Sequence, residues 1–215
     1  MAHGCLDASI VRYGAQAPLH MNESTMEPHH YLPDALRALR RARGWSLDRA
    51  ALETGVSKAM LGQIERGESS PTVATLWKIA SGFHVSLSAF LGPVPEGGEA
   101  GTVFRRAAAL RHQPGTDGML VAPLFPYEPR FGYELFELTL PPGYVRESEA
   151  HEPGVTETVI VLAGTMEVLT DGDWKCLTVG EAVRFPADRP HGYRNRGAAP
   201  AVFHNLIHYR SPGSC

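Results

Sequence analysis

The chain lacks any long hydrophobic run, and apolar stretches such as VIVLA at residues 159–163 are far too short to cross a bilayer. The first residues, MAHGCLDASIVRYGAQ, also lack the basic start and the apolar core of a secretory signal. Cysteine is scarce, since only Cys5, Cys176 and Cys215 are present, and they are widely spaced. These absences predict a cytoplasmic protein with no membrane segment and no disulfide framework.

The net charge of −3 conceals an uneven distribution along the 215 residues. Residues 31–92 contain eight Lys or Arg and five Asp or Glu, a net charge of +3, so the rest of the chain carries −6. A chain of this length accommodates one large or two ordinary domains. A basic segment inside an acidic chain suggests a polyanionic partner for that segment alone, although a solvated charged face is the equally simple alternative.

The N-terminal part of the sequence changes character near residue 31. Residues 1–30 mix His, Pro, Met and polar residues without a sustained period, so we expect a disordered extension, in which Met21 or Met26 is an alternative start to Met1. Residues 31–91 show helical segments bounded by capping residues and glycines. We expect five short helices: one from Asp34 to Gly44, and others capped by Ser46, Ser57, Thr72 and Ser86.

Residues 92–101, GPVPEGGEAG, have the composition of a linker. Beyond them the hydrophobic period becomes 2, and MLVAPLF, YELFELTL, ETVIVLAG, TMEVLTDGDWKCLTV, EAVRFP and AVFHNLIHY are predicted strands. Asp171-Gly172 predicts a tight hairpin turn. No long helical pattern interrupts residues 102–210. This part of the sequence therefore predicts an all-β sandwich or small barrel.

The segment GWSLDRAALETGVSKAMLGQIERGESSPTVATLWKIA resembles the helix-turn-helix of phage-repressor-like (XRE-family) regulators over its full length. The resemblance implies that one helix enters the major groove of DNA, with Ser57, Lys58, Ala59, Met60 and Gln63 facing the bases and Arg43 and Ser46 contacting phosphates. It also implies an architectural ion pair between Arg40 and Glu65. A helical domain used only for protein contacts is the alternative.

Two sets of residues in the strand-rich part carry a second resemblance. Gly143, Glu149, His151, Glu157 and Gly164 form the first set, and Gly180, Pro186, Asp188, His191 and Asn195 form the second, which begins sixteen residues after Gly164. Their spacing resembles the two motifs of the cupin family, a double-stranded β-helix or jelly-roll-like barrel. The first motif departs from the family pattern, because Glu149 stands in place of a His and the gap before Glu157 is longer.

The cupin resemblance implies a divalent transition metal, with zinc as the expected ion, held by His151, Glu157 and His191. Glu149 is a fourth candidate ligand, because on a strand it would point to the same side as His151. A metal-free barrel whose polar pocket takes an organic ligand is the alternative. Tyr127, Arg130 and His204 are candidates for lining an effector pocket, on weaker grounds.

A phage-repressor-like helix-turn-helix followed by a cupin is a domain combination of bacterial transcription regulators. Within that family, LFPYEP, GEAVRFPAD, HGYRNRG and LIHY resemble enterobacterial regulators of sulfur utilisation. The resemblance implies a homodimer that binds an inverted-repeat DNA operator and a small effector, such as a sulfur-containing amino acid. A metal-dependent dioxygenase or isomerase tethered to DNA, and an interaction scaffold that binds no operator, are the other hypotheses.

Overall fold

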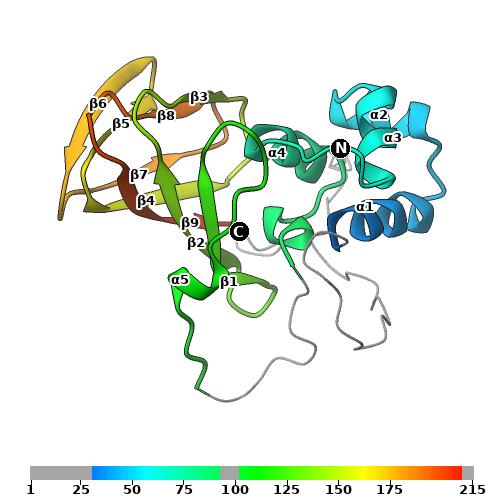
Figure 1. Ribbon diagram of the computed structural model, residues 1–215, viewed down its shortest axis with the longest axis horizontal. Coiled ribbons are helices and arrows are strands. Elements are labelled where there is room, and N and C mark those ends of the chain that lie inside the picture. The colour runs from blue at the N-terminus through cyan, green and yellow to red at the C-terminus, as the bar shows by residue number, and fades with distance from the viewer. Residues whose placement is uncertain (1–30, 93–101, 210–215) are drawn as a thin grey trace, which may run out of the picture.

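A computed structural model describes residues 31–92 and 102–209 of the chain. The expectations for residues 1–30, for the linker beyond Gly92, and for Cys5 and Cys215 lie outside these ranges. Within the described residues, helices occupy the N-terminal part and antiparallel strands the C-terminal part, so the two-part fold class expected from the sequence is confirmed (Figure 1). Among the same residues, no helix combines the length and apolar character that crossing a membrane requires.

The N-terminal part contains four α-helices within the described residues, and the last three begin at the caps that the sequence predicts. They are α1 (Tyr31–Ala42), α2 (Leu47–Thr54), α3 (Lys58–Glu65) and α4 (Val73–Gly82). The side chains of Ser46, Ser57 and Thr72 each accept a hydrogen bond from the backbone N–H three residues on, which satisfies a free donor of the first turn. Gly55 ends α2 at φ 65°, which a side chain would disfavour, and so permits the tight turn into α3.

Two helix predictions need correction. Helix α1 begins three residues before Asp34, because Pro33 is tolerated in a first turn, where its missing N–H has no partner to lose. The last expected helix is a 3-10 helix, η2 (Leu87–Phe90), and the Ser86 side chain does not cap it. The Ser86 hydroxyl pairs instead with the Ser88 hydroxyl at 3.0 Å.

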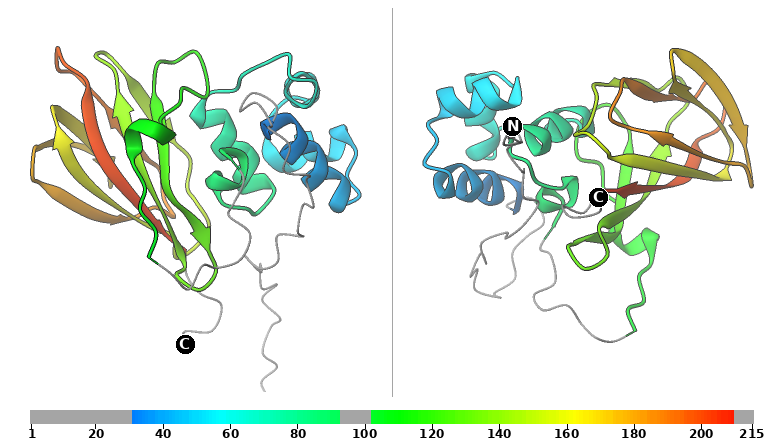
Figure 2. Two further views of the ribbon diagram at one scale, coloured as in Figure 1. Left: turned by 60° about the horizontal axis from the view of Figure 1, so that its bottom comes forward. Right: turned by 180° about the vertical axis from the view of Figure 1, so that it is seen from behind.

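The C-terminal part consists of two antiparallel sheets that face each other (Figures 1 and 2). One has the order β1-β2-β9-β4-β7 and the other β3-β8-β5-β6. The strands are β1 (Leu120–Glu128), β2 (Tyr133–Leu140), β3 (Val145–Ser148), β4 (Thr156–Ala163), β5 (Thr165–Thr170), β6 (Asp173–Thr178), β7 (Ala182–Pro186), β8 (His191–Arg194) and β9 (Ala201–His208).

The sequence patterns miss β3 and β8, which are four residues long and carry Arg, Glu, Ser, His and Gly instead of an apolar run. They also miss a single helical turn, α5 (Ala107–Leu110), in the strand-rich part. The hairpin at Asp171-Gly172 is confirmed: both residues have positive φ, 53° and 87°, which is the type I′ geometry that suits the twist of β5 and β6.

The two parts of the chain pack directly against each other through α4 and η2 (Figures 1 and 2). The Trp77 ring of α4 stacks on His151 with the ring centroids 4.5 Å apart. His84 Nδ1, just after α4, lies 2.6 Å from Glu152 Oε1. Buried apolar side chains of both parts form one continuous core, so the helical part is docked on the barrel and shares its packing.

The contact between the helical part and the barrel, through α4 and η2, is called the seam below. The fully buried carboxylate of Glu134 on β2 lies on it. It accepts hydrogen bonds from the Ser88 backbone N–H of η2 (3.1 Å) and from the Tyr209 hydroxyl. Burial raises the pKa of Glu134 despite these donors, because the charged form loses its hydration. The carboxylate therefore depends on partners from both parts of the chain.

The expected ion pair between Arg40 of α1 and Glu65 of α3 is confirmed. The guanidinium is bidentate, with Nε 2.6 Å from Oε1 and Nη2 2.8 Å from Oε2, and Arg40 Nη1 also donates to the Trp45 carbonyl at 2.9 Å. The two side chains are only 17% and 8% exposed. Since a buried carboxylate without a partner is costly, this pair holds α1 and α3 in one arrangement.

We predict that Arg40→Met lowers the free energy of unfolding by about 3 kcal/mol, because Glu65 is left buried and unpaired. The double variant Arg40→Met/Glu65→Met should recover most of the loss, since it removes both charges. Urea unfolding followed by circular dichroism measures both effects. Arg66→Met, which breaks the exposed pair with Glu68, is the control and should leave the midpoint nearly unchanged. Equal losses for Arg40→Met and Arg66→Met would contradict the assignment.

Candidate functional site

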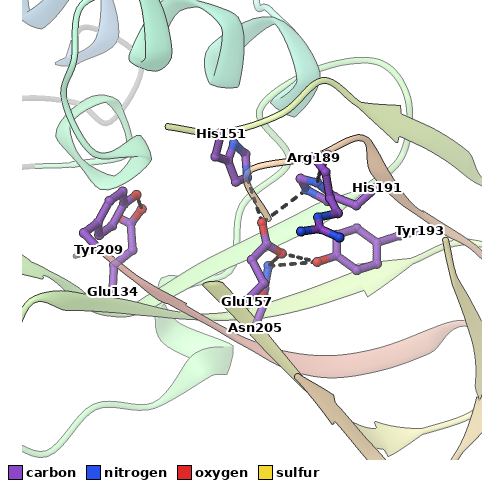
Figure 3. A network of polar contacts seen from close by, with 8 residues as sticks. All are labelled: Glu134, His151, Glu157, Arg189, His191, Tyr193, Asn205 and Tyr209. Atoms are coloured by element: carbon purple, nitrogen blue, oxygen red, sulfur yellow. Dashed lines mark hydrogen bonds and ion pairs between the residues drawn. The ribbon is translucent and has the colours of Figure 1, made fainter. Parts of the chain in front are cut away.

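Three side chains that the cupin motifs single out meet inside the barrel (Figure 3). Glu157 lies on β4, where Glu157, Val159 and Val161 are the buried, inward-facing positions. His191 begins β8, and its side chain is also buried. His151 follows β3 and is held by a hydrogen bond from its backbone N–H to the Ala187 carbonyl at 2.8 Å.

The three side chains converge through one carboxylate oxygen. His151 Nε2 lies 2.8 Å from Glu157 Oε1, and His191 Nε2 lies 3.3 Å from the same atom. One possible ligand atom from each residue falls within 4.8 Å of the other two. Two imidazole nitrogens and a carboxylate oxygen thus share one small region inside the barrel.

The other oxygen of Glu157, Oε2, has its own partners (Figure 3). It accepts hydrogen bonds from the Tyr193 hydroxyl and from Asn205 Nδ2, the latter at 2.9 Å. Tyr193 comes from β8 and Asn205 from β9, so two neighbouring strands fix the orientation of the carboxylate. With Oε2 occupied, Oε1 is the oxygen presented to the two imidazoles.

The surroundings of Glu157 favour its charged form. Burial alone would raise the pKa of this carboxyl, but the hydrogen bonds and charges of His151 and His191 outweigh burial and hold the pKa well below its usual value. Burial and the adjacent Glu157 charge together raise the pKa of Tyr193 well above 10, so its hydroxyl remains a hydrogen-bond donor. The cluster therefore contains an ionised carboxylate with a neutral phenol beside it.

His191 supplies the test of whether a cation fits here. Its Nδ1 lies 2.9 Å from the Arg189 carbonyl, a contact in which the ring N–H donates, so Nε2 of the neutral ring carries the lone pair. That Nε2 is buried and makes no hydrogen bond of ordinary geometry among the described residues, although it lies 3.3 Å from Glu157 Oε1. A lone pair facing an anion needs a proton or a metal ion between them, so the donor set fits a divalent cation.

The structure does not bring Glu149 into this cluster. β3 ends at Ser148, so the strand alternation expected for Glu149 and His151 does not hold. The Glu149 side chain is 84% exposed and forms an ion pair with Lys78 of α4 at 3.3 Å. Glu149 thus lies on the surface beside the helical part, not among the three convergent ligands.

The three suggested pocket residues also lie away from Glu157. His204 alternates with the inward-facing Phe203 and Asn205 on β9 and so faces outward. Arg130 is exposed and pairs with Glu128 at 2.8 Å, stacking on Phe131. Tyr127 is half-buried on the seam, where its backbone N–H donates to the Ser88 hydroxyl at 3.1 Å.

Sequence reasoning missed Tyr193, Asn205 and Trp77. Tyr193 is two positions after His191 on the same strand and therefore on the same face, so alternation could have found it. Asn205 could have been found in the same way, because it alternates with the apolar Phe203 and Ile207 on the inward face of β9. Trp77 contacts His151 only through packing between the helical and strand-rich parts, and no sequence pattern indicates that contact.

The second candidate site is the N-terminal end of α3. Ser57, Lys58, Ala59 and Gln63 are exposed there, and Met60 is half-buried against the core. Lys58 Nζ lies 2.8 Å from Asp48 of α2, an exposed pair that holds the ammonium group near the same surface. Of the two residues expected at phosphates, Ser46 caps α2 and Arg43 stacks over Trp45, its guanidinium carbon 5.2 Å from the ring centroid.

Comparison with known proteins places both parts in families. The Helix-turn-helix family matches residues 36–90, and the Cupin domain family matches residues 136–207. The HTH-type transcriptional regulator SutR of Escherichia coli (strain K12) is 48% identical over 179 residues, which cover 83% of this chain and 95% of the relative. The HTH-type transcriptional regulator SlrR of Bacillus subtilis (strain 168) is 39% identical over 54 residues, 25% of this chain and 36% of the relative.

The fold of the whole described chain also has a solved counterpart. The crystal structure of an HTH_3 family transcriptional regulator from Vibrio cholerae has a TM-score of 0.72 and 45% sequence identity. The match covers 85% of this chain and 97% of that one. The chain therefore belongs to the XRE-family HTH-type transcriptional regulators in which a helix-turn-helix domain is followed by a cupin domain.

Proposed function

We propose that this regulator binds a specific DNA operator as a homodimer in the cytoplasm and that its cupin barrel senses a small effector. The observation that carries the DNA half is the exposed N-terminal end of α3, where Lys58, Ala59 and Gln63 are free of the core. A recognition helix contacts base edges with these positions. Twofold symmetry would place two such helices about 34 Å apart on an inverted repeat.

The sensing half rests on the convergence of His151, Glu157 and His191. These residues would hold a divalent transition metal, of which zinc is the ion we propose, through two imidazole nitrogens and one carboxylate oxygen. Such an ion would leave coordination positions open for an effector. The resemblance to regulators of sulfur utilisation makes a sulfur-containing amino acid the effector class we propose.

Linkage between the two sites would work through α4. Because Trp77 stacks on His151, a ligand that shifts His151 changes the surface on which α4 rests. The effector would then stabilise one placement of the DNA-binding part over another, and so change operator affinity.

Two observations favour sensing over catalysis. The helical part is docked on the barrel, and Tyr193, with its raised pKa, would not serve as a base near neutral pH. Steady turnover of a thiol or amino acid by the metal-loaded protein would overturn this proposal.

We predict that Gln63→Ala relaxes base preference at one position in each operator half-site, because the amide group can make two hydrogen bonds to adenine. Selection of bound sequences from a random DNA pool measures this, and the expected loss of discrimination is about 1–3 kcal/mol at that position. Gln113→Ala, in the strand-rich part, is the matched control and should select the same sites as the unmodified chain. An unchanged preference in Gln63→Ala would show that Gln63 does not read the operator.

We predict that the full-length protein binds one zinc ion per chain and that Glu157→Gln and His191→Gln each abolish stoichiometric binding. Equilibrium dialysis followed by elemental analysis measures the bound metal. Glu149→Gln is the control and should bind as the unmodified chain does, because Glu149 is exposed and paired with Lys78. Retention of zinc by Glu157→Gln and His191→Gln would show that these side chains do not bind the metal.

We predict that Trp77→Ala uncouples the barrel from DNA binding. In the unmodified chain, zinc should change operator affinity by a factor of about 5–150, the usual range of coupling between two sites. Fluorescence anisotropy with the selected operator, with and without zinc, measures this factor. In Trp77→Ala the factor should approach one while zinc still binds. Trp174→Ala, on β6, should retain the coupling, and an equal loss in both variants would contradict a route through Trp77.

A further inference from the structure

A pocket of about 400 Å³ lies between the helical part and the barrel, beside His151. Trp77, Lys78 and His84 line it from the helical part, and Arg146, Ser148 and His151 line it from the barrel. The pocket lies where α4 rests on β3 and the segment that follows this strand. A ligand in it would contact both parts of the chain at once.

Arg146 is the unusual residue of this pocket. It is only 7% exposed, and its Nε is buried without a hydrogen-bond partner among the described residues. No carboxylate of the described residues lies within ion-pair distance of its guanidinium, whose nearest recorded contact is with the Trp77 ring, 6.0 Å from the centroid. A buried charge with unsatisfied donors is expensive, so the fold retains a cost at this position that an anion would relieve.

Ser148 adds a second unsatisfied group to the same surface. It is two residues after Arg146 on β3 and therefore lies on the same face, and its Oγ is buried without a hydrogen-bond partner among the described residues. In the pairing of β3 with β8, Arg146 lies opposite Tyr193 and Ser148 opposite His191. Both groups are thus adjacent to the His–Glu–His cluster.

The carboxylates around the pocket are already engaged or point elsewhere. Glu53 pairs with Arg49, Glu149 with Lys78, and Glu152 with His84. Glu147 is exposed and alternates with Arg146 to the opposite face of β3. Among the described residues, the positive charge of Arg146 is therefore left without a carboxylate partner.

We propose that this pocket binds the carboxylate of a small ligand, with the guanidinium of Arg146 as a bidentate donor and the Ser148 hydroxyl as a third. A guanidinium presents two parallel N–H groups that match the two oxygens of a carboxylate. The rest of the ligand lies in the pocket beside the stacked Trp77 and His151 rings, where it contacts both the DNA-binding part and the barrel. This assignment rests on the proposed sensing function. It adds that the effector is anionic at one end and that the effector binds at the seam.

Thermal unfolding of the full-length protein tests the site with acetate as the probe, in place of chloride at constant ionic strength. We expect 50 mM acetate to raise the Tm of the unmodified chain by about 2–4 °C, as binding at one site with a Kd of about 10 mM would. Arg146→Met should lose this shift, and in chloride its Tm should equal or exceed that of the unmodified chain, because a buried unpaired charge has been removed. Arg184→Met, on the exposed face of β7, is the control and should keep the acetate shift.

Ser148→Ala provides an independent variant should Arg146→Met fail to fold, and it should at least halve the acetate shift. An absent shift in the unmodified chain, or an undiminished shift in the folded pocket variants, would overturn the proposal. A shift with sulfate and none with acetate would overturn the carboxylate assignment in favour of a sulfur oxyanion. This experiment contains no DNA, so its failure leaves operator recognition by α3 standing, and a failure of Gln63→Ala leaves the pocket standing.

Discussion

The packing of α4 against the barrel is the contact on which the other features of this regulator depend. Trp77 stacks on His151, so a helix of the DNA-binding part touches one member of the polar cluster directly. The seam also buries Glu134, whose carboxylate takes one donor from η2 and another from the end of the barrel. Separating the two parts would remove a partner from a desolvated carboxylate, which is costly. The seam therefore resists opening, and under the proposed function a change at His151 would reach α4 through Trp77.

Two buried charged residues of the barrel, Glu157 and Arg146, differ in how far their charges are satisfied. Glu157 accepts hydrogen bonds from Tyr193 and Asn205, and His151 and His191 more than offset the cost of burying its charge. Arg146 has no such set of partners within the described residues, although β3 and β8 place it beside the same cluster. A satisfied charge fixes structure, whereas an unsatisfied charge stores a cost that a ligand can relieve. Under the proposed function, Glu157 would hold the site in shape and Arg146 would bind the ligand.

Features that depend on neighbours in sequence could be predicted. Ser46, Ser57 and Thr72 cap their helices, because a cap bonds a backbone group only three residues away. The turn at Asp171-Gly172 follows from residues that accept positive φ. Features that depend on packing were mispredicted: η2 is a 3-10 helix, the short strands β3 and β8 lack an apolar pattern, and Glu149 faces Lys78 across the seam. His204 was predicted to line the pocket, but it lies on the outer face of β9. Its neighbour Asn205, on the inner face, is the residue that contacts Glu157.

The sequence by itself determined the order of the two parts, the capped helices and the spacing of His151, Glu157 and His191 in the cupin motifs. All of these depend on hydrophobic periodicity and residue spacing along the chain. Only the tertiary structure decided which of the polar residues meet. Trp77 reaches His151, the buried Nε of Arg146 has no partner within the described ranges, and Glu134 is shared across the seam. These arrangements arise because segments distant in the chain exclude water from the same volume. Burial sets the cost of each charge, and burial is a property of the folded chain as a whole.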